Sequence, residues 1–372
     1  MNKVINQQSR PVVLMSKSEP YTRVIDTGAS GQILSVAFHP DGRHLFSGGE
    51  DKAVRQWDVA TGQEVGEPME MDSNVYAIAV SSDHRWIVTG SFCSTSVWDA
   101  KTHENVIEVE VEAGSISIDI HPDSSRFASG RYFEQTVNIW DITTGERLLG
   151  PLQHDNRPLG VKFSPGGEYI AAAGDQYTRV FDSRSGNQLT SIKIGMPTWC
   201  PMTPLAWSSD GQQIFTASCH RKLRAFDAPA GSQLAESQPI HDHGDVASIT
   251  LPIGNGKFIS TFATSSISFW DTSTFTQIGP AIEDRERIRS IALSADGSSL
   301  ATGGRNGKIT IRSLSGLLPE CYGPFNVGSC AFMLSPCLMI LSVNSYWPLA
   351  CSDGEDWIVS SFSLRADSDT LL

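Results

Sequence analysis

The sequence predicts an all-β protein built from repeated four-stranded sheets, and three observations carry this prediction. An aromatic residue followed by Asp ends a short apolar run six times, at intervals of 41 to 45 residues. Turn-forming residues recur at fixed offsets around each pair, and the short segments between the turns alternate apolar and polar residues, as half-buried strands do. A period of this length is typical of a β-propeller with four strands per blade. The six pairs are Trp57-Asp58, Trp98-Asp99, Trp140-Asp141, Phe181-Asp182, Phe226-Asp227 and Trp270-Asp271.

Each repeat begins with a predicted hairpin between its first two strands. Pro40-Asp41-Gly42 and Pro122-Asp123-Ser124 are examples of the turn, in which Pro presets φ and Asp bonds its own backbone. A second turn follows the aromatic-Asp pair, with Gly four residues after Asp at Gly62, Gly145, Gly186 and Gly231. In the third repeat these signals place strands at 116–120, 126–130, 137–140 and 147–152.

The stretch from Val36 to Asp51, followed by Val54-Arg55-Gln56-Trp57-Asp58, resembles the repeat consensus of the WD-repeat (WD40) family. The resemblance extends over roughly residues 22–316. It implies antiparallel four-stranded blades in a ring that an N-terminal strand closes, and Thr22 to Asp26 is suitably β-branched for that strand. We expect seven blades. An eighth, degenerate blade is the alternative, because Ser352, Asp356 and Phe362 repeat part of the spacing.

The expected organisation is a flexible tail over residues 1–20, the propeller over 21–316, and a degenerate segment over 317–372 that is either a partial extra blade or an irregular tail. The apolar run from Cys330 to Val343 is shorter than the roughly 20 residues of a spanning helix. We therefore expect no membrane association.

Blades of the WD-repeat family often hold a hydrogen-bonded tetrad of His, Ser or Thr, Asp and Trp, and the repeats keep it only in part. The first repeat has Ser47, Asp51 and Trp57 but no His, and the sixth has Ser260 and Trp270 with Thr264 in place of Asp. The fourth has His154 and Asp175, with Phe181 for Trp and Ala171 at the hydroxyl position. The chain therefore resembles a divergent member whose blades depend on apolar packing.

Composition excludes several functions. A net charge of -13 and a pI near 5.1 argue against nucleic-acid binding, which needs clustered Lys and Arg. Seven scattered Cys, no CxxC pair and a polar N-terminus indicate a reducing compartment, the cytoplasm or nucleus.

His241-Asp242-His243 lacks further ligands, so no metal or cofactor is expected. No nucleophile or phosphate-binding motif is present, so the chain is expected not to be an enzyme.

Basic and aromatic residues in loops of one propeller face form the candidate partner-binding set. Arg side chains grip carboxylate or phosphate with a planar fork, and aromatic rings serve as anchors. This pattern predicts capture of an acidic or phosphorylated segment of another protein. The set comprises Tyr76, Phe133, Arg157, Trp199, Arg221, Arg287, Arg289 and Arg305.

The sequence therefore predicts a non-enzymatic interaction scaffold or adaptor that binds proteins or peptides. Two narrower alternatives stay open. Phe181-Asp182-Ser183-Arg184 resembles the Trp-Asp-x-Arg box of WD-repeat substrate receptors in cullin-based ubiquitin ligases. Thr61-Gly62-Gln63 and Thr144-Gly145-Glu146 resemble repeats of propellers attached to fungal and bacterial signal-transduction NTPases, which implies a detached sensor arm.

Overall fold

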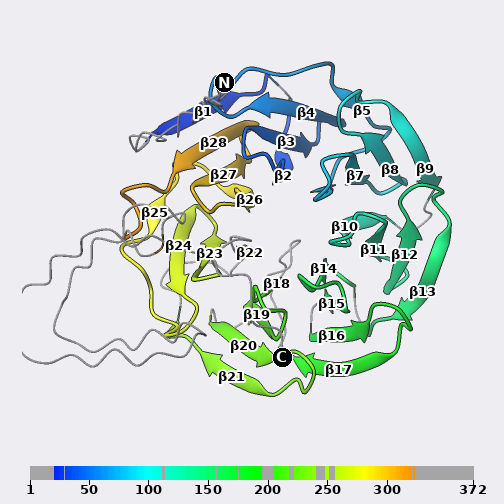
Figure 1. Ribbon diagram of the computed structural model, residues 1–372. Helices are drawn as coiled ribbons and strands as arrows, with labels where there is room; N and C mark the ends of the chain where they lie inside the picture. The colour runs from blue at the N-terminus through cyan, green and yellow to red at the C-terminus, as the bar shows by residue number, and fades with distance from the viewer. Residues whose placement is uncertain are drawn as a thin grey trace, which may run out of the picture. The chain divides into compact units, whose positions relative to one another are not determined.

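A computed structural model describes residues 21–28, 30–110, 114–155, 157–174, 176–194, 205–217, 222–239, 248–250, 256–319 and 322. Within this part of the chain the strands form seven four-stranded antiparallel sheets, and Figure 1 shows them arranged as the blades of a ring. The predicted all-β propeller is confirmed. Across the same residues, no helix is long and apolar enough to cross a bilayer.

The blades follow one another along the chain, each running from the inner strand to the outer strand. Blades one to three are β2 (Ile33–Phe38), β3 (His44–Gly49), β4 (Ala53–Asp58) and β5 (Met69–Glu70); β6 (Ala77–Val80), β7 (Trp86–Gly90), β8 (Ser94–Asp99) and β9 (Asn105–Glu110); β10 (Ser115–Ile120), β11 (Arg126–Arg131), β12 (Thr136–Asp141) and β13 (Arg147–Gln153). Blades four and five are β14 (Gly160–Phe163), β15 (Tyr169–Ala173), β16 (Tyr177–Asp182) and β17 (Gln188–Lys193); β18 (Leu205–Trp207), β19 (Gln213–Ala217), β20 (Leu223–Asp227) and β21 (Gln233–Glu236). Blade six is β22 (Ser248–Thr250), β23 (Phe258–Ala263), β24 (Ser266–Asp271) and β25 (Ile282–Glu283). Blade seven is β26 (Ile288–Leu293), β27 (Ser299–Gly304), β28 (Lys308–Ser313) and β1 (Thr22–Asp26).

The turn residues act as the sequence predicts. Gly42 in the first hairpin and Gly62 after β4 have φ of +67° and +74°, a region in which glycine has no steric penalty. Asp58, the second residue of its Trp-Asp pair, accepts hydrogen bonds from the backbone and hydroxyl of Thr61 at 2.6 and 2.8 Å. The recurring Asp is thus explained by turn closure: its carboxylate bonds the backbone that leads into the outer strand.

Serine side chains join the inner strands of neighbouring blades. Ser35 accepts a hydrogen bond from the Ile78 backbone at 3.1 Å, Ser117 accepts one from Val161, and Ser290 accepts one from Val36 at 3.0 Å. Each of these serines directly follows a register shift in its strand. A β-bulge re-aims a side chain in this way, here toward the next blade.

Ring closure follows from two contacts of blade seven. Strand β1 pairs antiparallel with β28, so the N-terminal strand completes the last sheet. The Val36–Ser290 bond places blade one directly beside blade seven. The prediction of seven blades closed by residues 22–26 is confirmed. The segment considered for an eighth blade, residues 350–362, lies outside the described residues.

Apolar side chains between neighbouring sheets form the core. One such cluster joins Ile25 of β1 and Ile33 of β2 to Trp57 of β4 and Ile309 of β28, and it closes the ring. Beyond residue 316, Leu318 is buried, and the Tyr322 hydroxyl donates a 2.6 Å hydrogen bond to Asp271 at the end of β24.

The buried indoles locate the tetrad hydroxyls. Trp57 donates to Ser47 at 2.8 Å, Trp98 to Thr89 at 2.9 Å, Trp140 to Ser129 at 2.9 Å and Trp270 to Thr261 at 3.2 Å. In each case the hydroxyl lies two positions beyond the residue that pairs with Trp across the strands, on the same face of the sheet.

This rule corrects two positions predicted from sequence. The hydroxyl of blade six is on Thr261 rather than Ser260, because Trp270 pairs with Ile259 and the neighbouring residue points to the other face. The equivalent position of blade four is Ala172 rather than Ala171, because Phe181 pairs with Ile170.

The acidic and histidine positions of the tetrad also differ from the family pattern. Asp51 forms an ion pair with Arg55 at 3.3 Å, and the ring of His154 lies 3.2 Å from the Ala172 carbonyl oxygen. Asp175 lies outside the described residues. In blade seven, Arg312 takes the place of Trp and donates to Thr302 at 3.2 Å and to Asp284 at 2.8 Å.

Candidate interaction surface on the loop face

The antiparallel order of each blade divides its connections between two faces of the ring. The links from second to third strand, and from the outer strand to the next inner strand, emerge together; we term this side the loop face. The hairpins between first and second strands and the turns after the aromatic-Asp pairs emerge on the opposite side, the turn face. Six of the candidate partner-binding residues are described, and they lie in or beside these links on the loop face: Tyr76, Phe133, Arg157, Arg287, Arg289 and Arg305.

An aromatic cluster covers the loop face of blades two to four. It consists of Tyr76, Phe92, Tyr132 and Phe133 together with Arg157. The rings of Tyr76 and Phe92 meet edge to face with centroids 4.5 Å apart, and Phe133 lies 6.1 Å from Phe92 and 5.1 Å from Tyr132. Arg157 lies over the Tyr132 ring at 4.7 Å and donates to its phenol oxygen at 2.6 Å. Side chains from three blades thus form one continuous contact.

The exposed members of the cluster are Phe133, at 66%, Phe92, at 37%, and Arg157. The backbone holds them in place. A Cβ on Gly114 would lie 2.6 Å from the Phe92 ring, so this glycine gives the ring its room, and Arg131 pairs with Glu134 at 2.7 Å within the loop that carries Phe133. Arg157 forms no ion pair with a described residue, so its charge faces solvent.

The basic residues of blade seven form a second group. The Arg305 backbone donates to the Arg287 carbonyl at 2.9 Å, and both side chains are exposed. Arg289 is half-buried and donates to Gln32 at 2.6 Å, and Gln32 in turn donates to Glu50. The structure therefore places Arg287, Arg289 and Arg305 close to the boundary between blades seven and one. Arg157 is separate from them and belongs to the aromatic cluster. Trp199 and Arg221 lie outside the described residues.

Sequence reasoning found Tyr76, Phe133 and Arg157 but missed Phe92 and Tyr132. Both lie in the links from second to third strand, one repeat apart along the chain. Equivalent positions of neighbouring repeats become neighbours in the ring, and this offset is the signal that could have located them.

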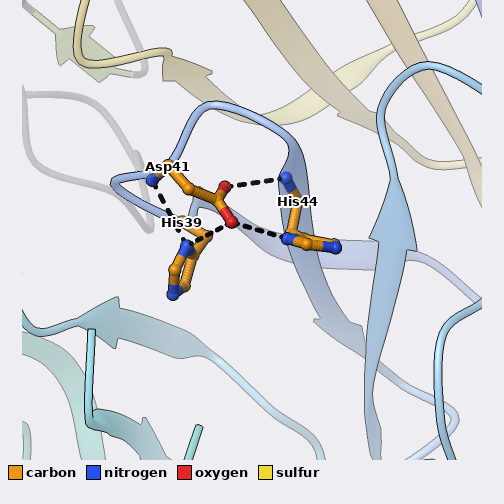
Figure 2. A group of neighbouring side chains, drawn as sticks. All are labelled: His39, Asp41 and His44. Atoms are coloured by element: carbon orange, nitrogen blue, oxygen red, sulfur yellow. Dashed lines mark hydrogen bonds and ion pairs between the residues drawn. The ribbon is translucent and has the colours of Figure 1, made fainter. Parts of the chain in front are cut away.

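A polar cluster on the turn face was also missed (Figure 2). His39 and Asp41 belong to the first hairpin of blade one, and His44 begins β3. The Asp41 Oδ2 atom lies 3.0 Å from His39 Nδ1 and 2.7 Å from His44 Nδ1. Burial opposes ionisation of Asp41, but hydrogen bonds from the His44 ring and from the Arg43 and His44 backbones outweigh it and lower its pKa to about 2. Burial lowers the pKa of His39. The neighbouring His84 and His44 lower it further, whereas the Asp41 carboxylate raises it.

Comparison with known proteins identifies the repeat. The family model for the WD domain, G-beta repeat, matches residues 21–58, 68–99, 108–141, 147–182 and 277–313. The chain is a WD-repeat protein. The resemblance seen in its Trp-Asp pairs and hairpin turns is thereby confirmed.

Three relatives illustrate the range of this WD-repeat protein's similarities. The chain is 24% identical to a guanine nucleotide-binding protein subunit beta of Arabidopsis thaliana over 316 residues, which is 78% of this chain and 82% of the relative. It is 26% identical to the target of rapamycin complex subunit LST8 of Rattus norvegicus, over 48% of this chain and 59% of the relative. It is 28% identical to the protein groucho of Drosophila melanogaster, over 55% of this chain and 28% of the relative.

These relatives do not bear on the two narrower resemblances. None of the three is named as an NTPase or a ligase receptor, so the likeness to NTPase-linked propellers stays a prediction. In the Trp-Asp-x-Arg-like segment, Arg184 is exposed on the turn face and its backbone donates to Asp182 at 3.1 Å.

Proposed function

We propose that this WD-repeat protein is a non-catalytic scaffold that binds a segment of another protein on its loop face, through the aromatic cluster. The observation that carries the proposal is the contact of Tyr76 and Phe92 of blade two with Tyr132 and Phe133 of blade three, with Arg157 of blade four at its edge. Exposed aromatic rings beside an Arg form the kind of patch on which binding energy concentrates.

The chemistry of the cluster indicates the bound segment. Phe133 and Phe92 offer exposed ring surface to an apolar side chain, and Arg157 offers a guanidinium already oriented by Tyr132. A held guanidinium loses less conformational entropy on binding, and its fork matches a carboxylate or a phosphate. The proposed ligand is therefore an apolar residue followed closely by an acidic or phosphorylated one. Arg287 and Arg305 form a separate exposed basic group at blade seven.

The relatives support the scaffold role at the level of their names. The guanine nucleotide-binding protein subunit beta and the LST8 subunit are each named as one member of a larger assembly. The chain spans 59% of LST8 and 28% of groucho, so any partner shared with those proteins is itself part of the proposal.

The test is quantitative affinity purification of the full chain from its native cells. In the loop-face variant, Phe133→Ala is combined with Arg157→Ala. The matched control combines Leu148→Ala with Arg147→Ala, because these are likewise an exposed apolar residue and an exposed Arg, but on outer strand β13. We expect the co-purified partners to fall at least about tenfold in the loop-face variant and to stay in the control. Equal recovery in both variants would refute the proposal.

A phosphatase arm separates the two anionic ligands. If the segment is phosphorylated, treatment of the lysate should remove the same partners that the loop-face variant loses. If it carries Asp or Glu, treatment should leave them bound.

A further inference from the structure

Three imidazoles and one carboxylate converge on the turn face between blades one and two. His39 and His44 both contact the same oxygen of Asp41, and the ligand atoms of these three residues all lie within 4.8 Å of one another. His84, in the hairpin of blade two, packs against His39 with ring centroids 4.8 Å apart. Figure 2 shows the two rings of blade one directed at the carboxylate.

The equivalent hairpins of other blades show how many side chains the turn Asp needs. The residue two before the turn Asp is Ser81 in blade two and Ser294 in blade seven, and each donates to its Asp at 2.6 Å. A single hydroxyl therefore suffices to close the hairpin. Blade one places an imidazole there and adds a second imidazole to the same carboxylate oxygen, which the turn does not require.

Blade three provides an internal comparison. Its hairpin has the same His-Pro-Asp sequence, and His121 Nδ1 lies 2.7 Å from Asp123. The position of the second imidazole is taken by Arg126, whose guanidinium lies 3.1 Å from His121 Nε2. A guanidinium cannot bind a metal and repels one, so blade three keeps the turn but loses the ligand set.

The distances in blade one suit a tetrahedral metal ion. Zinc binds His nitrogen at about 2.0–2.1 Å and carboxylate oxygen at about 2.0–2.2 Å, so neighbouring ligand atoms lie roughly 3.3 Å apart. The carboxylate oxygen is 3.0 and 2.7 Å from the two nitrogens, so these separations would have to grow by roughly 0.3 and 0.6 Å to admit the ion. The side chains of His39 and His44 are 12% and 29% exposed, which anchors them while leaving a path from solvent.

We propose that His39, Asp41 and His44 form a binding site for a late first-row transition metal, with zinc as the natural occupant. Imidazole nitrogen with one carboxylate selects zinc, nickel or copper over calcium and magnesium, which prefer oxygen ligands. The fourth tetrahedral position falls to His84, after rotation of its side chain, or to water. When His84 takes it, the ion links the hairpins of blades one and two.

The experiment titrates the chelator-treated full chain with Zn²⁺ by calorimetry and with Co²⁺ by visible absorption. His44→Gln removes one ligand but keeps the backbone bond from residue 44 to Asp41, and His121→Gln in blade three is the matched control. Loss of even an outer partner of a metal ligand weakens affinity about 10–100-fold, so His44→Gln should weaken Zn²⁺ binding at least that much. His121→Gln should bind like the wild type, and Ca²⁺ should not compete.

A thermal readout covers the case in which a variant is less stable. Zn²⁺ should raise the unfolding temperature of the wild type and of His121→Gln, because a ligand that binds only the folded state stabilises it. It should leave that of His44→Gln nearly unchanged. The proposal is overturned if the wild type shows no saturable Zn²⁺ site, or if His44→Gln binds Zn²⁺ with unchanged affinity. His84→Ala reduces affinity if that ring is the fourth ligand and leaves it unchanged if water is.

Discussion

Arg157 donates a 2.6 Å hydrogen bond to the phenol oxygen of Tyr132 and lies over its ring, joining the loops of blades four and three. The same Tyr132 ring contacts Phe133, and Phe92 of blade two contacts both rings. Because these loops start from strands that are fixed in neighbouring sheets, the cluster is a surface of the assembled ring rather than of any single blade. Partner binding should therefore depend on ring closure.

Closure can be tested on the N-terminal strand. Ile25 of β1 is 4% exposed within the cluster that joins blades seven and one, whereas its neighbour Val24 is 58% exposed. Ile25→Asp buries a carboxylate among apolar side chains and should lower the free energy of unfolding by more than about 4 kcal/mol. Val24→Asp should change it by less than about 0.5 kcal/mol. Chemical denaturation measures both, and similar losses in the two variants would contradict closure by this strand.

The corrected tetrad position gives a second matched pair. Thr261→Val removes the acceptor of the Trp270 indole and should cost about 1–3 kcal/mol, because the indole N–H is left buried and unsatisfied. The buried hydroxyl of Ser260 has no hydrogen-bond partner among the described residues, so Ser260→Ala should be neutral or slightly stabilising. Unfolding midpoints compare the two. If Ser260→Ala lowered the unfolding midpoint more than Thr261→Val, the tetrad hydroxyl would be that of Ser260, as the sequence predicts.

In blade seven the charged Arg312 takes the place of the Trp indole and pairs with Asp284. We therefore expect the effects of these two residues on the free energy of unfolding to be strongly coupled. Arg312 and Asp284 form a nearly buried ion pair at 2.8 Å. Removing one partner leaves the other charge uncompensated, so Arg312→Met or Asp284→Asn alone should cost up to about 3–5 kcal/mol. The double variant should cost clearly less than the sum of the single variants. Additive losses in a double-mutant cycle would show that the pair does not interact.

The acid stability of the protein should depend on Asp271. Burial opposes its ionisation, but hydrogen bonds from Ser273, Tyr322 and Thr274 outweigh it and hold its pKa below the usual 3.8. A carboxyl whose folded-state pKa is depressed contributes stability above its unfolded pKa, and this contribution is lost as the pH falls below 3.8. Tyr322→Phe removes one of these bonds, so it should be less stable than the wild type at pH 7, and the difference should narrow below pH 3.8.

Denaturation curves at several pH values measure this difference. Tyr177→Phe is the control, since the Tyr177 hydroxyl makes no hydrogen bond to any residue that the structure describes. If the loss caused by Tyr322→Phe is the same at pH 7 and below pH 3.8, Asp271 does not gain its charge stabilisation from Tyr322.

The fold was predictable from sequence because its signals are local and repeated. Glycines such as Gly42 and Gly62 adopt positive φ in a turn without steric penalty, so they indicate the turns directly. The spacing of the Trp-Asp pairs gives the length of each blade. The strand faces were predicted less well at Ala171 and Ser260, since a slip of one residue reverses the face and only the pairing of Phe181 or Trp270 settles it.

The candidate sites depend on contacts between repeats, which a reading of one repeat at a time misses. Phe92 meets Tyr132, and His84 meets His39, across blade boundaries. Each pair occupies matching turns or loops of adjacent repeats. His44 could not be recognised for another reason: a His beside a hairpin is common, and only the structure shows that the Asp41 carboxylate contacts two imidazole rings.

Site-specific photo-crosslinking can establish whether the loop-face aromatic cluster contacts another protein. A photoreactive phenylalanine analogue is placed at position 133 on the loop face or at position 148 on outer strand β13, both highly exposed, at 66% and 53%. We expect a defined crosslinked partner from position 133, lost when Arg157→Ala is added, and none from position 148. Crosslinks of equal yield from both positions, or from position 148 alone, would show that the cluster is not the binding surface.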